Sequence, residues 1–107
     1  MAKLPKRFLE FMESYPAIGS AYESMGDAVS RAGQLDRKTQ ALVKLGIAIG
    51  AKMEGAAHSQ TRKALEAGAT PEEVRHAALQ ATTTLGFPSM MAGLSWVEDV
   101  LKNRTSS

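Results

Sequence analysis

The fold is decided by residues 41–51, ALVKLGIAIGA, in which Lys44 is the only charged residue. A helix that is apolar on most of its faces is buried among other helices, so this segment predicts the centre of an all-α fold. A polar sequence, residues 52–60, follows directly and contains Glu54 and His58, four residues apart. Residues at this spacing lie together on one side of a helix, so two ionisable groups are expected close to the core.

Length and composition indicate an ordinary globular chain. A chain of 107 residues suits one domain with a modest core, and 44% apolar with 22% charged residues is typical of soluble proteins. The formal net charge is +2, and the basic residues are scattered among acidic ones, unlike a nucleic-acid-binding surface. The N-terminus lacks the apolar segment of a signal peptide, and no apolar run is long enough to span a membrane. We therefore expect a cytoplasmic protein with neither a nucleic-acid nor a membrane partner.

The sequence contains no cysteine, and His58 and His76 are its only histidines. The absence of cysteine excludes disulfides, thiol nucleophiles and zinc sites built on sulfur. A metal ion would have to take most of its ligands from carboxylates. We therefore assign no metal site and expect no cofactor.

Apolar residues recur at helical spacing along the chain, and no alternating strand pattern persists. Three stripes are Phe8, Phe11, Met12 and Tyr15; Ile18, Tyr22, Met25, Val29 and Ala32; and Ala57, Thr61, Ala64 and Leu65. Two further stripes are expected to point inward: Val74, Ala77, Ala78, Ala81 and Leu85; and Met90, Met91, Leu94, Val97 and Leu101. We predict a compact bundle of about five or six helices that forms a single domain over residues 1–102. Residues 103–107 are expected to form a disordered polar tail.

Local signals predict where several helices begin and end. Asp36 is a suitable N-cap for the central helix, because its carboxylate can accept hydrogen bonds from free N–H groups of the first turn. Gly68 is expected to end a helix in the left-handed conformation. The sequence Thr70-Pro71-Glu72-Glu73 predicts a capping box, with Thr70 as the cap and Glu73 bonding back to it.

The predicted core is rich in alanine and glycine, which favours a homo-oligomer. Such residues remove little apolar area from water, and burial contributes about 25 cal/mol per Å². A monomer would therefore be thinly stabilised, whereas association of several copies would bury the remaining apolar faces. The alternative is a monomer that leaves its apolar surplus on the surface.

Four segments carry a resemblance to a known family: Leu35-Asp36 with Lys38-Thr39; Leu42-Val43 with Leu45 and Ile47-Ala48; Ala64-Leu65 with residues 67–74; and Gly86-Phe87-Pro88. In this order they resemble the carboxymuconolactone decarboxylase family, which includes the alkyl hydroperoxidase D-like proteins. The resemblance covers about residues 35 to 90. It implies an alkyl hydroperoxidase D-like, all-α fold that assembles as dimers, trimers or hexamers.

The redox branch of that family uses the pattern Glu-x11-Cys-x2-Cys-x3-His. Counted back from Gly68, its four positions fall on Ala41, Met53, Ala56 and Gln60. None of these residues can form the thiolate and disulfide that peroxide reduction requires. We therefore expect no thiol peroxidase or disulfide reductase activity.

The decarboxylase branch implies chemistry without cysteine. A lactone acid that loses CO₂ needs a group that places its carboxylate and an acid that protonates the resulting dienolate. His58 could be that acid with Glu54 as its partner, although His58 lies two positions before the histidine position of the family. Gln60, Met53 and Arg62 are candidate substrate-binding residues. For Arg62 the alternative is a place on the solvated face of the helix.

Two functions follow from this sequence. One is an oligomeric binding or scaffold protein of unassigned activity, in which Glu54 interacts with the helix dipole and His58 makes local hydrogen bonds. The other is a cysteine-free lyase that acts on a small organic acid or lactone through Glu54 and His58. A closed apolar cavity that contains both residues would favour the lyase, and exposed salt bridges would favour the scaffold.

Overall fold

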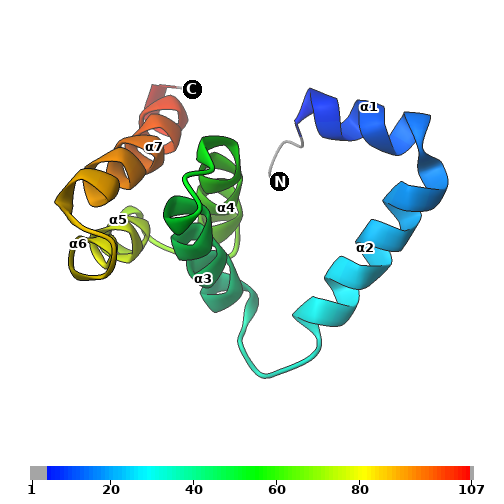
Figure 1. Ribbon diagram of the computed structural model, residues 1–107, viewed down its shortest axis with the longest axis horizontal. Helices are drawn as coiled ribbons and strands as arrows, with labels where there is room; N and C mark the ends of the chain where they lie inside the picture. The colour runs from blue at the N-terminus through cyan, green and yellow to red at the C-terminus, as the bar shows by residue number, and fades with distance from the viewer. Residues whose placement is uncertain (1–4, 107) are drawn as a thin grey trace. The chain divides into compact units, whose positions relative to one another are not determined.

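The computed structural model describes the backbone of residues 5–106 and the side chains of residues 5–103. Within this part of the chain all elements are α-helices, which confirms the predicted all-α class (Figure 1). The helices are α1 (Lys6–Ser14), α2 (Pro16–Ser30), α3 (Arg37–Gly50), α4 (Glu54–Glu66), α5 (Pro71–Leu79), α6 (Ala81–Thr84) and α7 (Phe87–Ser106). They divide into two compact units, Met1–Leu35 and Asp36–Ser107.

The first unit contains α1 and α2, which approach each other closely at one glycine. Pro16 occupies the first turn of α2 and separates the two helices. A Cβ atom at Gly19 would lie 2.5 Å from Met12 Sδ, so a larger residue here would displace the end of the methionine side chain. The rings of Phe8 and Tyr22 meet edge to face with their centroids 6.1 Å apart. These two contacts join α1 to α2.

The apolar stripe predicted for α2 is present but exposed. Ile18, Tyr22, Met25 and Val29 are between 57% and 61% exposed, and Gly19 is the buried residue of this helix. The stripe predicted for α2 is therefore left uncovered by its own unit. The physical reason is that a two-helix unit has too few neighbours to cover this face of α2.

The second unit is a bundle in which α3, α4, α5 and α7 surround a shared core. The stripe predicted for α4 is confirmed, because Ala57, Thr61, Ala64 and Leu65 are all buried. The hydroxyl of Thr61 donates a hydrogen bond of 2.8 Å to the carbonyl of Ala57, so this buried polar group is satisfied.

The central helix is covered on one side only. Its buried residues are Ala41, Leu45, Ala48 and Ile49. Val43 and Ile47 are exposed, Ile47 to 64%. The expectation that residues 41–51 are buried on most faces is therefore wrong, because the remaining helices of the bundle leave this side of α3 uncovered. Leu85 and Met91, which were expected to point inward, are also exposed.

The predicted helix ends are confirmed. Asp36 Oδ1 accepts a hydrogen bond of 2.8 Å from the N–H of Thr39, and this bond lowers the pKa of the Asp36 carboxyl. Gly68 has φ of 104° and ends the helix in the left-handed region, where glycine has no steric penalty. These local predictions succeed because each involves groups only a few residues apart.

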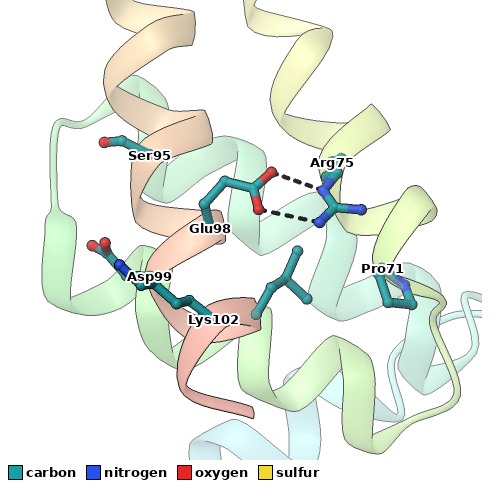
Figure 2. A pocket seen from close by; sticks show the side chains of 7 residues that line it. Pro71, Arg75, Ser95, Glu98, Asp99 and Lys102 are labelled. Carbon is teal, nitrogen blue, oxygen red and sulfur yellow. Dashed lines mark hydrogen bonds and ion pairs between the residues drawn. The ribbon is translucent and has the colours of Figure 1, made fainter. Parts of the chain in front are cut away.

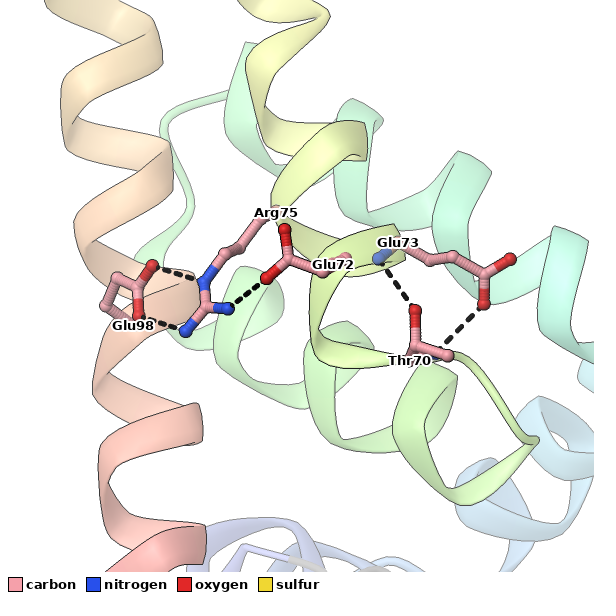
Figure 3. A network of polar contacts seen from close by, with 5 residues as sticks. All are labelled: Thr70, Glu72, Glu73, Arg75 and Glu98. Atoms are coloured by element: carbon pink, nitrogen blue, oxygen red, sulfur yellow. Dashed lines mark hydrogen bonds and ion pairs between the residues drawn. The ribbon is translucent and has the colours of Figure 1, made fainter.

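The capping box at the start of α5 has both of its hydrogen bonds (Figure 3). The Glu73 N–H donates to Thr70 Oγ1 over 3.0 Å, and the Thr70 N–H donates to Glu73 Oε1 over 2.9 Å. Lys38 Nζ also donates to Glu73 Oε2 over 3.2 Å, which links α3 to α5. The bond from Thr70 first, and that from Lys38 second, hold the pKa of Glu73 below its ordinary value.

The last helix extends to Ser106, so residues 103–106 of the predicted polar tail are helical in the backbone. Ser107 lies outside the described residues. The single domain over residues 1–102 stays a prediction. Among the described residues, no helix combines the length and the apolar character that crossing a membrane requires.

Replacement of the cap residue, Thr70→Ala, should lower the free energy of unfolding by about 1 kcal/mol, because the Glu73 N–H loses its acceptor. The measurement is denaturant unfolding followed by far-UV circular dichroism at fixed protein concentration. Thr83→Ala is the matched control, since it removes an exposed hydroxyl in α6. Equal stability of Thr70→Ala and Thr83→Ala would contradict the capping role.

The lowered pKa of Glu73 predicts a pH-dependent contribution to stability. A carboxyl with a lowered folded-state pKa stabilises the protein above its ordinary pKa, here 4.5, and loses this effect as the pH falls through the folded-state value. The melting temperature of the wild type should therefore exceed that of Glu73→Gln at neutral pH. The difference should shrink as the pH falls below 4.5. A difference that does not change with pH would argue against this assignment, and Glu66→Gln serves as control for an exposed carboxylate.

Candidate functional site

A tight turn between α3 and α4 places the two predicted catalytic residues. The chain reverses at Lys52, which has φ of 60°, and the N–H of Met53 donates to the carbonyl of Ala48 over 2.9 Å. Helix α4 starts immediately afterwards, so Glu54 and His58 lie in its first two turns. A carboxylate at this end of a helix interacts favourably with the helix dipole.

Three ionisable side chains meet at this position and form the Glu54–His58–Asp99 cluster. His58 Nε2 lies 3.1 Å from Asp99 Oδ2 of α7 and 3.9 Å from Glu54 Oε2. One ligand-type atom of each side chain lies within 4.8 Å of the other two. The structure therefore confirms that Glu54 and His58 lie together and adds Asp99 as a third member.

The cluster is open to solvent. The side chain of His58 is 25% exposed, whereas those of Glu54 and Asp99 are 60% and 56% exposed. A carboxylate that contacts an imidazole can orient the ring. Because both carboxylates are more than half exposed, the cluster is a group of surface polar contacts and not a closed apolar cavity.

Sequence analysis did not identify Asp99. It lies 41 positions after His58 in the chain, and it follows Val97 in a helix whose apolar stripe was the visible signal. No local pattern connects α4 with α7. The partner of His58 therefore becomes evident only when the two helices are packed.

The predicted substrate-binding residues lie in the turn before α4 and along this helix. Met53 lies exposed in the turn, and Gln60 and Arg62 are partly buried. Residues two positions apart point to different sides of a helix, so Gln60 does not share the side of His58, whereas Arg62, four positions on, does. Their role in binding an organic acid stays a prediction.

A surface hollow of about 860 Å³ lies between α5 and α7 (Figure 2). Its lining residues are Pro71, Arg75, Ser95, Glu98, Asp99, Leu101 and Lys102. Asp99 borders this hollow, but Glu54 and His58 do not line it. The hollow is therefore no closed active-site cavity around the predicted catalytic pair.

Arg75 in the hollow is engaged by two carboxylates (Figures 2 and 3). Its Nε and Nη2 donate to the two oxygens of Glu98 over 2.7 and 3.2 Å, and Nη1 donates to Glu72 Oε1 over 2.6 Å. These bonds, with Glu98 first, raise the pKa of the Arg75 guanidinium above its ordinary value. The guanidinium thus ties α5 to α7, and its donors are directed at protein carboxylates.

The other sequence candidates lie apart from the cluster. His76 is exposed on α5, and Met90 is buried in the core while Met91 is exposed. The positions that match the redox pattern carry a buried alanine at 41, a thioether at 53, a methyl group at 56 and an amide at 60. None of these groups supplies a thiolate.

The sequence of this all-α, cysteine-free chain matches a known protein family. The model of the carboxymuconolactone decarboxylase family matches residues 16–99, from the first residue of α2 to Asp99. The match covers more than half of the chain, and the chain therefore belongs to the carboxymuconolactone decarboxylase family. No curated protein matches the sequence.

Proposed function

We propose that this protein is an oligomeric member of its family that acts as an assembly or binding protein and performs no thiol chemistry. The single observation that carries this proposal is the row of large apolar side chains exposed along α2. The sequence has no cysteine, so peroxide reduction by a thiol has no reacting atom in this chain. The expected cytoplasmic location belongs to the same proposal.

The row on α2 has the form of a helix-packing surface. Ile18, Tyr22, Met25 and Val29 follow one another at intervals of four, three and four residues, and all four are more than half exposed. A helix with this spacing suits shallow packing against another helix, with side chains fitting between those of the partner. Exposed apolar rows rimmed by polar residues mark interaction surfaces.

The partner most consistent with this surface is a second copy of the chain. Val43 and Ile47 expose a further apolar strip on α3, so each of the two units has apolar surface that its own helices leave uncovered. Closed symmetric assemblies of identical chains are the commonest way to bury such surfaces. The formal net charge of +2 is small, so repulsion between copies would not oppose association.

The open cluster supports the same proposal. Glu54, His58 and Asp99 lie together on a solvated surface, and the hollow beside Asp99 does not enclose the other two. Acid–base catalysis on a lactone acid benefits from a site that excludes water. The scaffold hypothesis accommodates this exposure without further assumptions.

Native mass spectrometry and size-exclusion chromatography with light scattering should show a dimer, trimer or hexamer for the wild type. The variant Met25→Glu should shift the population strongly toward the monomer, because it places a charge in the apolar row. Ser24→Glu is the matched control, since it adds the same charge to an exposed neighbour on the polar side of α2. A monomeric wild type, or equal assembly of the two variants, would refute the proposal.

The contact between His58 and Asp99 favours a second function, that of a lyase. The 3.1 Å contact between Asp99 Oδ2 and His58 Nε2 is short enough to orient the imidazole as a general acid. In that role His58 would protonate the dienolate that remains when a small lactone acid loses CO₂. Glu54, at 3.9 Å from the same nitrogen, would be the secondary carboxylate.

An activity panel distinguishes the two functions. In a mixture of hydrogen peroxide or an alkyl hydroperoxide with a thiol reductant, we expect the protein not to increase the rate at which the peroxide is consumed. With a panel of lactone acids and keto acids, the scaffold hypothesis predicts no release of CO₂. The lyase hypothesis requires that the wild type releases CO₂ from one of these acids. The variant His58→Ala should lose this activity, and the matched variant His76→Ala should keep it. Reproducible peroxide turnover would contradict both hypotheses.

A further inference from the structure

The Glu54–His58–Asp99 cluster offers one nitrogen and two carboxylates from two helices at short range. The two residues of α4 are one helical turn apart, and α7 brings the third from a distant part of the chain. We propose that this cluster binds one divalent transition-metal ion of the zinc type, with water completing its coordination. This inference does not depend on the proposed assembly, because all three side chains belong to one unit of one chain.

The distances within the cluster are close to those of a metal site. Around an ion with bonds of about 2.0 to 2.2 Å, neighbouring ligand atoms lie about 3.0 to 3.5 Å apart. His58 Nε2 is already 3.1 Å from Asp99 Oδ2, and Glu54 Oε2 is 3.9 Å from the same nitrogen. A rotamer adjustment of the exposed Glu54 side chain is sufficient to bring its oxygen to the required separation.

The charges of the cluster favour a cation. Two carboxylates, Glu54 and Asp99, have oxygens within 4.8 Å of each other and share one imidazole. Like charges at this separation repel each other. A divalent ion between them replaces this repulsion with two attractive contacts, while the neutral imidazole supplies a third bond without adding charge.

The donor set selects the class of ion. Imidazole nitrogen with carboxylate oxygen suits zinc and its first-row neighbours, whereas magnesium and calcium prefer sites composed of oxygen alone. Three protein ligands leave at least one position for water, as in open zinc sites. The exposure of Glu54 and Asp99 leaves room on the solvent side for that water.

A metal ion and the acid–base role of His58 exclude each other at the same atom. An ion bound to Nε2 uses the lone pair of this nitrogen, so the ring proton must reside on Nδ1. Nε2 then can neither donate nor accept a proton during a reaction. Zinc binding therefore excludes an acid–base role through Nε2 in the metal-loaded protein, but not one through Nδ1.

The test is isothermal titration of the full chain with zinc chloride after removal of metals with a chelator and dialysis. We expect one ion per chain in the wild type and a loss of affinity of at least about tenfold in Asp99→Asn, His58→Ala and Glu54→Gln. The matched controls His76→Ala and Glu66→Gln change the same residue types at exposed positions and should bind as the wild type does. A parallel titration with magnesium chloride should give no measurable binding.

Three outcomes would overturn the inference: no zinc uptake by the wild type, uptake unaffected by Asp99→Asn and Glu54→Gln, or a loss confined to His76→Ala. Glu54 is 60% exposed, so its glutamine variant tests the site without disturbing the core. Visible absorption of the cobalt-loaded protein provides a second measurement, because its band should change in Asp99→Asn. The oligomeric mass is measured on the metal-free protein, so failure of the assembly proposal leaves the zinc result interpretable.

Discussion

The close approach of α7 to α3 at Gly93 is the constraint on which the second unit depends. A Cβ atom at Gly93 would lie only 2.7 Å from Cγ2 of Ile49, and Ile49 is itself almost fully buried. The backbone of α7 can therefore come this near to α3 only because position 93 has no side chain. Fully buried alanines at positions 57 and 64 give α4 a similarly small inner face. Short distances between helix axes follow from small residues at the contacts, and they allow Asp99 to reach His58 across the α4–α7 boundary.

The same small residues explain the apolar surface that remains. About half of the core residues of the second unit are alanines, which let helices approach closely but remove little apolar area per residue. The larger apolar side chains, such as Tyr22, Met25 and Ile47, are left outside the cores of their units. The proposed association of copies would bury these exposed side chains.

Local features were predictable from the sequence, and long-range pairs were not. The caps at Asp36 and Thr70 and the buried stripe of α4 depend on groups within a few residues of one another. The pairs of Arg75 with Glu98 and of His58 with Asp99 span 23 and 41 positions, and no periodicity encodes them. The sequence overestimated the burial of α3 for a related reason. An apolar pattern predicts that a helix face is shielded from water, but it does not identify which helix or which partner covers that face.

The position of His58 decides how far family chemistry applies to this protein. The family pattern places its histidine at position 60, and an α-helix turns by about 100° per residue. Side chains at 58 and 60 therefore point about 200° apart around α4, so His58 faces a different neighbourhood from the one that the family histidine would occupy. In this chain the neighbour on that side is α7, which presents Asp99 at 3.1 Å. The neighbours of His58 are consequently two carboxylates that the redox pattern does not contain, and the proposed metal ion would be bound by both carboxylates and the imidazole.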